Sequence, residues 1–147
     1  MACLALAPYF NLIISYSWFN MSQILMIEPD RVLAETYKKT FESAGHNVAI
    51  AFNAQTAITA ADKIKPDVVL LELQLINHSG IEFLYEFRSY DDWRSVPVII
   101  LSNIPLAEFD GSHDLLVKEL GVDTYFYKPT TTIKRLSSAI NQLNVIA

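Results

Sequence analysis

The sequence predicts an α/β fold in which one parallel β-sheet is covered by helices on both faces. From Ser22 onward, short apolar runs alternate with helical patterns five times. The runs are apolar at successive positions, which is typical of strands buried on both faces. The connections are short, so we expect right-handed strand–helix–strand crossovers. A chain of 147 residues fits one domain of this kind.

The first strand is the run QILMI, residues 23–27. The first helix is predicted over residues 30–45, where Asp30 can cap its start and Gly45 its end. Its spacing predicts one buried face, formed by Val32, Leu33, Thr36, Tyr37, Thr40, Phe41 and Ala44.

The second strand is HNVAIAF, residues 46–52, and an Ala-rich helix follows over 53–65. Asn53 opens this helix and Pro66 ends it, because a residue before proline disfavours the helical region. The third strand is DVVLLE, residues 67–72. The helix predicted over the next segment, 80–92, carries Ile81, Leu84, Tyr85 and Arg88 at helical spacing.

The fourth strand is VPVIILS, residues 96–102, with Pro97 near its start, where a missing N–H is tolerated. The next helix, residues 114–121, ends at a glycine. The fifth strand is VDTYFYK, residues 122–128, and a closing helix covers 130–146.

Composition excludes several classes of protein. The chain is 52% hydrophobic and 18% charged, which is typical of folded rather than disordered proteins. A net charge of -5 argues against direct nucleic-acid binding. The single cysteine, Cys3, excludes an internal disulfide and a Cys-rich metal site. His46, His78 and His113 lack metal-ligand spacing, so we expect them in surface loops or at helix ends.

Residues 1–21 form an uncharged N-terminal extension, since the first charged side chain of the chain is Glu28. The extension is short for a membrane span of about 20 mainly apolar residues, and it lacks the basic region of a secretory signal. We favour an upstream start or a loose appendage. A membrane anchor, an extra packed helix and a partner-binding segment are the alternatives.

Polar side chains stand where four of the five predicted strands end. The carboxyl ends of parallel strands meet at one edge of the sheet, so we expect these residues to converge: Glu28, Pro29, Asp30, Glu72, Ser102 and Lys128. Such a set suits a metal–phosphoryl unit, because carboxylates bind the cation while a hydroxyl and an ammonium contact phosphoryl oxygens. The alternative is a set of ordinary polar residues that meet solvent.

From Ser22 to Leu143 the chain resembles a receiver domain of a two-component response regulator, a CheY-like module. The segments that carry the resemblance are ILMIEPDRVL, KPDVVLLELQLINHSGIEFL, VPVIILSN and GVDTYFYKP, in the family's order. The resemblance implies a flavodoxin-like (βα)5 three-layer sandwich with sheet order 2-1-3-4-5. It assigns residues 22–147 to a receiver (response regulatory) domain.

The resemblance also shows two departures from the family's pattern. Glu72 stands in place of the phosphoacceptor aspartate, and Pro29 in place of the second acid of the magnesium pair. Ser79 replaces a loop acid. Glutamate is one methylene longer than aspartate, and small misplacements can reduce a rate about a hundredfold. We therefore expect neither ordinary aspartyl phosphorylation nor a cofactor, and Mg²⁺ would have only Glu28, Asp30 and Glu72 as candidate ligands.

Ser102 and Lys128 are retained at the positions where the family contacts the phosphoryl group. An ion pair between Glu72 and Lys128 could hold a conformation that resembles the phosphorylated one. The alternative is an acid tolerated in a decayed pocket, because an exposed pair contributes only about 0–1 kcal/mol. Tyr125 stands where the family often has an aromatic switch residue; the alternative is a half-buried strand aromatic.

The expected function is a stand-alone, cytoplasmic receiver in a phosphorelay, which acts by protein contact and is not an enzyme. We expect no output domain after the closing helix. One alternative is a divergent receiver that is still phosphorylated, using metal with Glu72 or Asp30. Another is a flavodoxin-like or nucleotide-binding protein, which EPDRV disfavours, because no Gly-rich phosphate loop follows the first strand.

The resemblance implies a signalling partner: a histidine kinase, a phosphotransfer protein or an output protein. We expect no nucleic-acid or membrane partner. In the family, the face formed by the fourth helix, fifth strand and fifth helix commonly meets partners, and a homodimer through this face is a further candidate. The loop NIPLAEFDGSHD, residues 103–114, is longer than usual and would change partner choice rather than the fold.

Overall fold

The computed structural model describes residues 21–108 and 112–146. The strands are β1 (Gln23–Ile27), β2 (Asn47–Ala51), β3 (Val68–Leu71), β4 (Val98–Ser102) and β5 (Val122–Tyr127). The α-helices are α2 (Arg31–Ser43), α3 (Ala54–Lys63), α4 (Gly80–Ser89), α5 (Ser112–Asp114) and α6 (Ile133–Ile146). Short 3₁₀ helices lie at Asp91–Trp93, Leu106–Glu108 and Lys128–Thr130, and a π-helical turn continues α5 over Leu115–Glu119.

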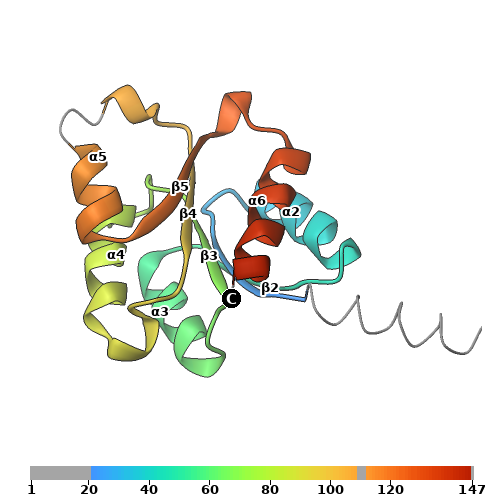
Figure 1. Cartoon of the computed structure of the whole chain (residues 1–147), viewed down its shortest axis with the longest axis horizontal. Coiled ribbons are helices and arrows are strands. Elements are labelled where there is room, and N and C mark those ends of the chain that lie inside the picture. The colour runs from blue at the N-terminus through green and yellow to red at the C-terminus, as the bar shows by residue number, and fades with distance from the viewer. Residues whose placement is uncertain (1–20, 109–111, 147) are drawn as a thin grey trace, which may run out of the picture.

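The five strands form one parallel sheet in the order β2-β1-β3-β4-β5, which confirms the predicted order. Helices α2 and α6 cover one face of this sheet, and α3, α4 and α5 cover the other (Figure 1). The molecule is therefore the three-layer sandwich that the sequence predicts.

Successive side chains of each strand pack on opposite faces of the sheet, which explains why the strands have no polar face. In β1, Ile24 and Met26 pack toward α2 and α6, whereas Leu25 and Ile27 pack toward α3 and α4. Successive side chains of a strand point to opposite faces, so a sheet covered on both sides needs apolar residues at every position.

Side chains cap the helices much as the sequence predicts. The Asp30 carboxylate accepts the backbone N–H groups of Val32 and Leu33, each at 3.0 Å, and begins α2. Asn53 begins α3 in the same way. Ser79 forms a capping box with Glu82 at the start of α4.

The face predicted for the first helix is partly wrong, because Val32 is 79% exposed. In α4, Tyr85 is 52% exposed. The residues of these helices that are buried are Ala34, Tyr37 and Phe41 in α2 and Gly80, Phe83, Leu84 and Phe87 in α4. Val32 lies two positions before Ala34, which is about 200° around the helix, so the two side chains cannot both face the sheet.

His46 is buried, and the prediction of a surface position for it is wrong. Its Nδ1 accepts the backbone N–H of Ser22 at 3.1 Å, and this bond joins the start of β1 to the start of β2. His78 and His113 are exposed, as predicted. A buried polar ring is tolerated here because it has a hydrogen-bond partner.

The half-buried side chain of Arg88 holds together the two loops at the amino end of β4 and β5. Its guanidinium donates hydrogen bonds to five backbone carbonyls: those of Trp93, Arg94, Val96, Leu120 and Gly121. Arg88 therefore satisfies loop carbonyls that no strand or helix pairs.

The N-terminal extension predicted at 1–21 lies outside the described residues, except for Met21. Among the helices in the described part of the chain, none has both the length and the apolar character needed to cross a bilayer.

Candidate functional site

The strand register brings four of the predicted polar residues to one level of the sheet. Ile27 pairs with Leu71, so Glu28 and Glu72 leave β1 and β3 side by side. The backbone N–H of Glu72 still bonds Ile27 O at 3.0 Å. Ser102 ends β4 opposite Tyr127 in β5, and Lys128 is the next residue. The convergence predicted from the strand ends therefore exists for Glu28, Glu72, Ser102 and Lys128.

The ammonium of Lys128 lies between the two carboxylates. Its Nζ donates to Glu72 Oε2 at 2.6 Å and also to Glu28 Oε2. The side chains are only 8% (Lys128), 6% (Glu28) and 4% (Glu72) exposed. The expectation of an exposed pair is therefore wrong. Removing one partner of a buried pair costs about 3–5 kcal/mol, against about 0–1 kcal/mol for an exposed pair.

The second carboxylate oxygen of Glu72 is also occupied. Oε1 accepts the Ser102 hydroxyl at 2.5 Å and the Gln74 backbone N–H at 3.0 Å. The Glu72 carboxylate therefore contacts Lys128 and Ser102 at the same time.

Hydrogen bonds continue from Ser102 to Tyr125. Ser102 Oγ accepts the backbone N–H of Ile104 at 3.2 Å. The Tyr125 hydroxyl donates to the carbonyl of the same Ile104 at 2.5 Å. Glu72 is therefore connected to Tyr125, a half-buried aromatic on β5, through the Ser102 hydroxyl and the backbone N–H and C=O of Ile104.

The remaining predicted site residues do not join this group. Pro29 has no carboxylate, and the Asp30 carboxylate caps α2 while its backbone N–H bonds Glu28 Oε1 at 3.0 Å. Ser79 caps α4. Within residues 21–108 and 112–146, no three His, Cys, Asp or Glu side chains are placed to hold one metal ion.

The contacts hold both partners in their charged forms. Burial alone would raise the pKa of Glu72, but hydrogen bonds from Lys128, Ser102 and the Gln74 N–H outweigh it and lower this pKa. Burial alone would lower the pKa of Lys128, but Glu28 and Glu72 outweigh it and raise this pKa. At neutral pH Lys128 is therefore an ammonium and Glu72 a carboxylate.

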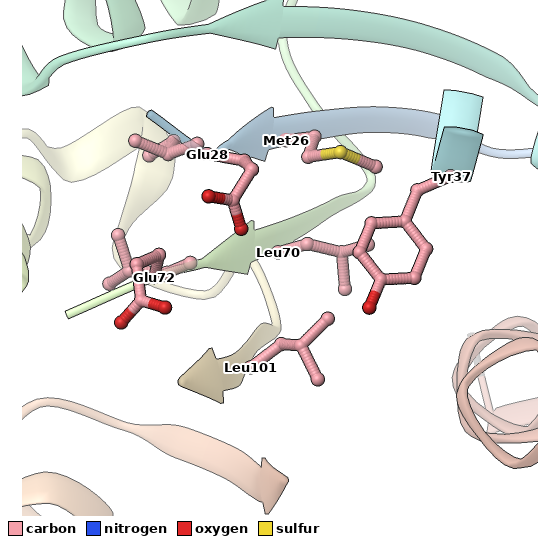
Figure 2. A pocket seen from close by; sticks show the side chains of 8 residues that line it. Met26, Glu28, Tyr37, Leu70, Glu72 and Leu101 are labelled. Carbon is pink, nitrogen blue, oxygen red and sulfur yellow. The ribbon is translucent and has the colours of Figure 1, made fainter. Parts of the chain in front are cut away.

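A cavity of about 10 Å³ lies next to these carboxylates. Figure 2 shows its lining: Met26, Glu28, Tyr37, Leu70, Glu72 and Leu101, together with Ile27 and Leu71. Tyr37 comes from α2, and sequence reasoning did not assign it to the site. The helical pattern placed it on the buried face, but no signal indicated that it lies opposite Glu28. The cavity has room for about one water molecule.

Comparison with known proteins agrees with the fold and shows the family of the chain. The family model of the response regulator receiver domain matches residues 24–141. KdpE, the KDP operon transcriptional regulatory protein of Escherichia coli, is 31% identical over 109 residues, which are 74% of this chain and 45% of KdpE. The DNA-binding response regulator MtrA of Mycobacterium tuberculosis is 31% identical over 107 residues, 73% of this chain and 44% of MtrA. The chain thus matches less than half the length of these relatives.

Solved receiver structures superpose closely. The receiver domain of Francisella response regulator 1452 has a TM-score of 0.73 at 26% identity, covering 85% of this chain and 98% of that one. The chemotaxis protein CheY4 of Vibrio cholerae has a TM-score of 0.74 at 20% identity, covering 84% and 98%, and supports the fold alone.

Proposed function

The chain belongs to the response regulator receiver family of two-component signalling, and from this premise we propose that it signals by protein contact without ordinary aspartyl phosphorylation. The observation that carries the proposal is the buried arrangement of Glu28, Lys128 and Glu72. All four carboxylate oxygens already accept hydrogen bonds inside the protein.

Phosphorylation would require a carboxylate oxygen that can attack a donor in line. At position 72 this oxygen belongs to a glutamate, whose Oε1 and Oε2 are held by Ser102 and Lys128. Attack would break these contacts, and a misplaced nucleophile can lose about a hundredfold in rate. The same contacts favour a structural role for Glu72 over a role as the nucleophile.

The proposed role of Glu72 is to hold the switch residues in one state without a donor. Its bond to Ser102 continues through Ile104 to Tyr125. If one conformation alone keeps these contacts, a difference of about 3 kcal/mol would shift a balanced equilibrium more than a hundredfold. A conformation that left one partner buried without the other would cost about 3–5 kcal/mol, which is enough for this bias, whereas an exposed pair contributes only about 0–1 kcal/mol.

The surface next to Tyr125 supports a role in binding proteins. Tyr125 lines a cavity of about 250 Å³ between β5 and the turn that follows α5, beside Leu116 and Val122. This cavity lies on the face predicted to meet a histidine kinase, a phosphotransfer protein or an output protein. Self-association through α5, β5 and α6 and a cytoplasmic location stay predictions. Light scattering of the purified chain tests the dimer.

A second function has one observation in its favour, because Ser102 and Lys128 stand where the family contacts a phosphoryl group. A divergent receiver that accepts phosphate on Glu72 would need to release both side chains. Incubating the full chain with acetyl phosphate and Mg²⁺, followed by intact-mass measurement, separates the two functions.

We expect no gain in mass for the natural sequence. The matched control is the double variant Pro29→Asp/Glu72→Asp, which restores the family's acids and should gain one phosphoryl group. A stable phosphoryl adduct on the unmodified chain would overturn the proposal. The switch role has its own test, since Glu72→Gln should move the amide resonances of Ser102 and Tyr125; unchanged spectra would end that part.

A further inference from the structure

The two buried carboxylates have a cation between them, and this cation is a side chain of the protein. Lys128 Nζ contacts one oxygen of Glu28 and one of Glu72. The ammonium is itself almost fully buried. Solvent therefore has little access to the space between the carboxylates.

The residues present do not fit Mg²⁺. This ion needs near-octahedral oxygen ligands at about 2.0–2.1 Å and usually keeps several of its waters. The oxygens of Glu28 and Glu72 are engaged by Lys128, Ser102 and two backbone N–H groups. The adjoining cavity, at about 10 Å³, has room for about one water. The carboxylate of the third acid, Asp30, caps the amino end of α2.

We infer that Lys128 is the resident cation of this site, and that a divalent cation must displace its ammonium rather than bind beside it. Displacement would leave a buried ammonium without its carboxylates, which is strongly unfavourable. The contacts among Glu72, Ser102 and Tyr125 would then persist when divalent cations are removed. The inference deepens the proposed function, on which it rests, by making the module independent of Mg²⁺.

The test is a Mg²⁺ titration of the full chain at constant ionic strength, followed by amide shifts of Glu28, Glu72 and Ser102. The natural sequence should show no saturable shift at millimolar Mg²⁺. Lys128→Met keeps most of the apolar stem and removes the charge, so Oε2 of Glu28 and Oε2 of Glu72 lose their donor and become free to bind Mg²⁺. We expect its Mg²⁺ affinity to be at least about tenfold higher, equivalent to about 1.4 kcal/mol.

Two matched variants control this comparison. Lys134→Met removes an exposed lysine of α6 and should behave like the natural sequence. Lys128→Met/Glu72→Gln removes one of the two carboxylates and should lose the gained affinity. The double variant leaves one buried carboxylate without a cation instead of two, so it can be measured even if Lys128→Met alone fails to fold. Mg²⁺ binding by the double variant would overturn the inference.

Saturable binding of Mg²⁺ at Glu28 and Glu72 in the natural sequence would overturn the inference directly. A folded Lys128→Met protein that binds Mg²⁺ no better than the natural sequence would also overturn it. The phosphodonor experiment tests the proposed function separately. A phosphoryl adduct without Mg²⁺ binding would contradict the proposed function and would not contradict the role of Lys128 as the resident cation. Mg²⁺ binding without an adduct would contradict the role of Lys128 and would not contradict the proposed function.

Discussion

Replacing Glu72 with glutamine removes one of the two negative charges that flank the buried Lys128 ammonium and keeps nearly the same side-chain volume. The amide oxygen of the new side chain can still accept a hydrogen bond from Ser102 or from the Gln74 N–H. Its amide NH₂, however, would face the Lys128 ammonium, donor against donor. The perturbation therefore isolates the charge-assisted bond of 2.6 Å between Lys128 and position 72.

The contacts in the structure set the size of the expected effect. A hydrogen bond to a charged group contributes about 1.5–3 kcal/mol. Lys128 keeps Glu28, so the loss stays below the about 3–5 kcal/mol of a stranded buried charge. We expect Glu72→Gln to lower the free energy of unfolding by about 2 kcal/mol, which corresponds to about 4–8 °C in Tm for a chain of this size.

The assay is urea unfolding of the full chain at pH 7, with the slope m compared to show that the denatured state is unchanged. The matched control is Glu42→Gln, which breaks the exposed Lys38–Glu42 pair on α2, with side chains 34% and 46% exposed. This control should lose at most about 0.5 kcal/mol. A loss for Glu72→Gln no larger than that of the control would refute the reasoning.

The pH dependence gives a second check with a defined sign. The pKa of Glu72 is lowered in the folded state, so its stabilisation is present above the unfolded value of about 4.3 and is lost as pH falls through the folded value. The pKa of Lys128 is raised, so its contribution is present below about 10.4 and is lost as pH rises through the folded value. The difference in free energy of unfolding between the natural sequence and Glu72→Gln should therefore shrink at low and at high pH. A difference that stays constant with pH would contradict this prediction.

Three further variants test the surroundings of the site. Burial lowers the pKa of His46, so the stability of the natural sequence should fall as pH drops below about 6.5. In His46→Gln the urea midpoint should depend less on pH in this range; the same pH dependence in both proteins would contradict the prediction. Arg88→Met should lower the free energy of unfolding in urea by about 3 kcal/mol, because five carbonyls lose the hydrogen bond from Arg88 and only that of Trp93 keeps another donor, the Val96 N–H; a loss under about 1 kcal/mol would count against that role. In Gly80→Ala the new Cβ would lie 2.8 Å from Leu73 Cα, so the loop after β3 must shift, at about 1–3 kcal/mol by thermal unfolding; an unchanged Tm would contradict the packing.

The strands and their order were predictable because their signals are local. Runs such as residues 23–27 are apolar at successive positions, and the segments that resemble the receiver family imply the sheet order that the structure has. The caps at Asp30 and Asn53 were also predictable, since a capping side chain bonds only to the next turn of its own helix.

Other features depend on contacts between distant segments. The exposure of Val32 and the burial of His46 follow from how α2 and β2 are rotated against their neighbours, which a helical or apolar pattern does not specify. The proximity of Tyr37 to Glu28 has the same origin. These are the positions where prediction from the sequence was wrong or incomplete.

The order of residues along the chain determined which chemical groups reach the carboxyl edge of the sheet: glutamates at 28 and 72, a proline at 29, a serine at 102 and a lysine at 128. Only the tertiary structure decided that the ammonium lies between both glutamates, almost fully shielded from water. The reason is that the strength of an ion pair depends on distance and on the surrounding dielectric. Both are set by the sheet, which brings together the ends of β1, β3 and β5 although Glu28 and Lys128 are 100 residues apart in the chain.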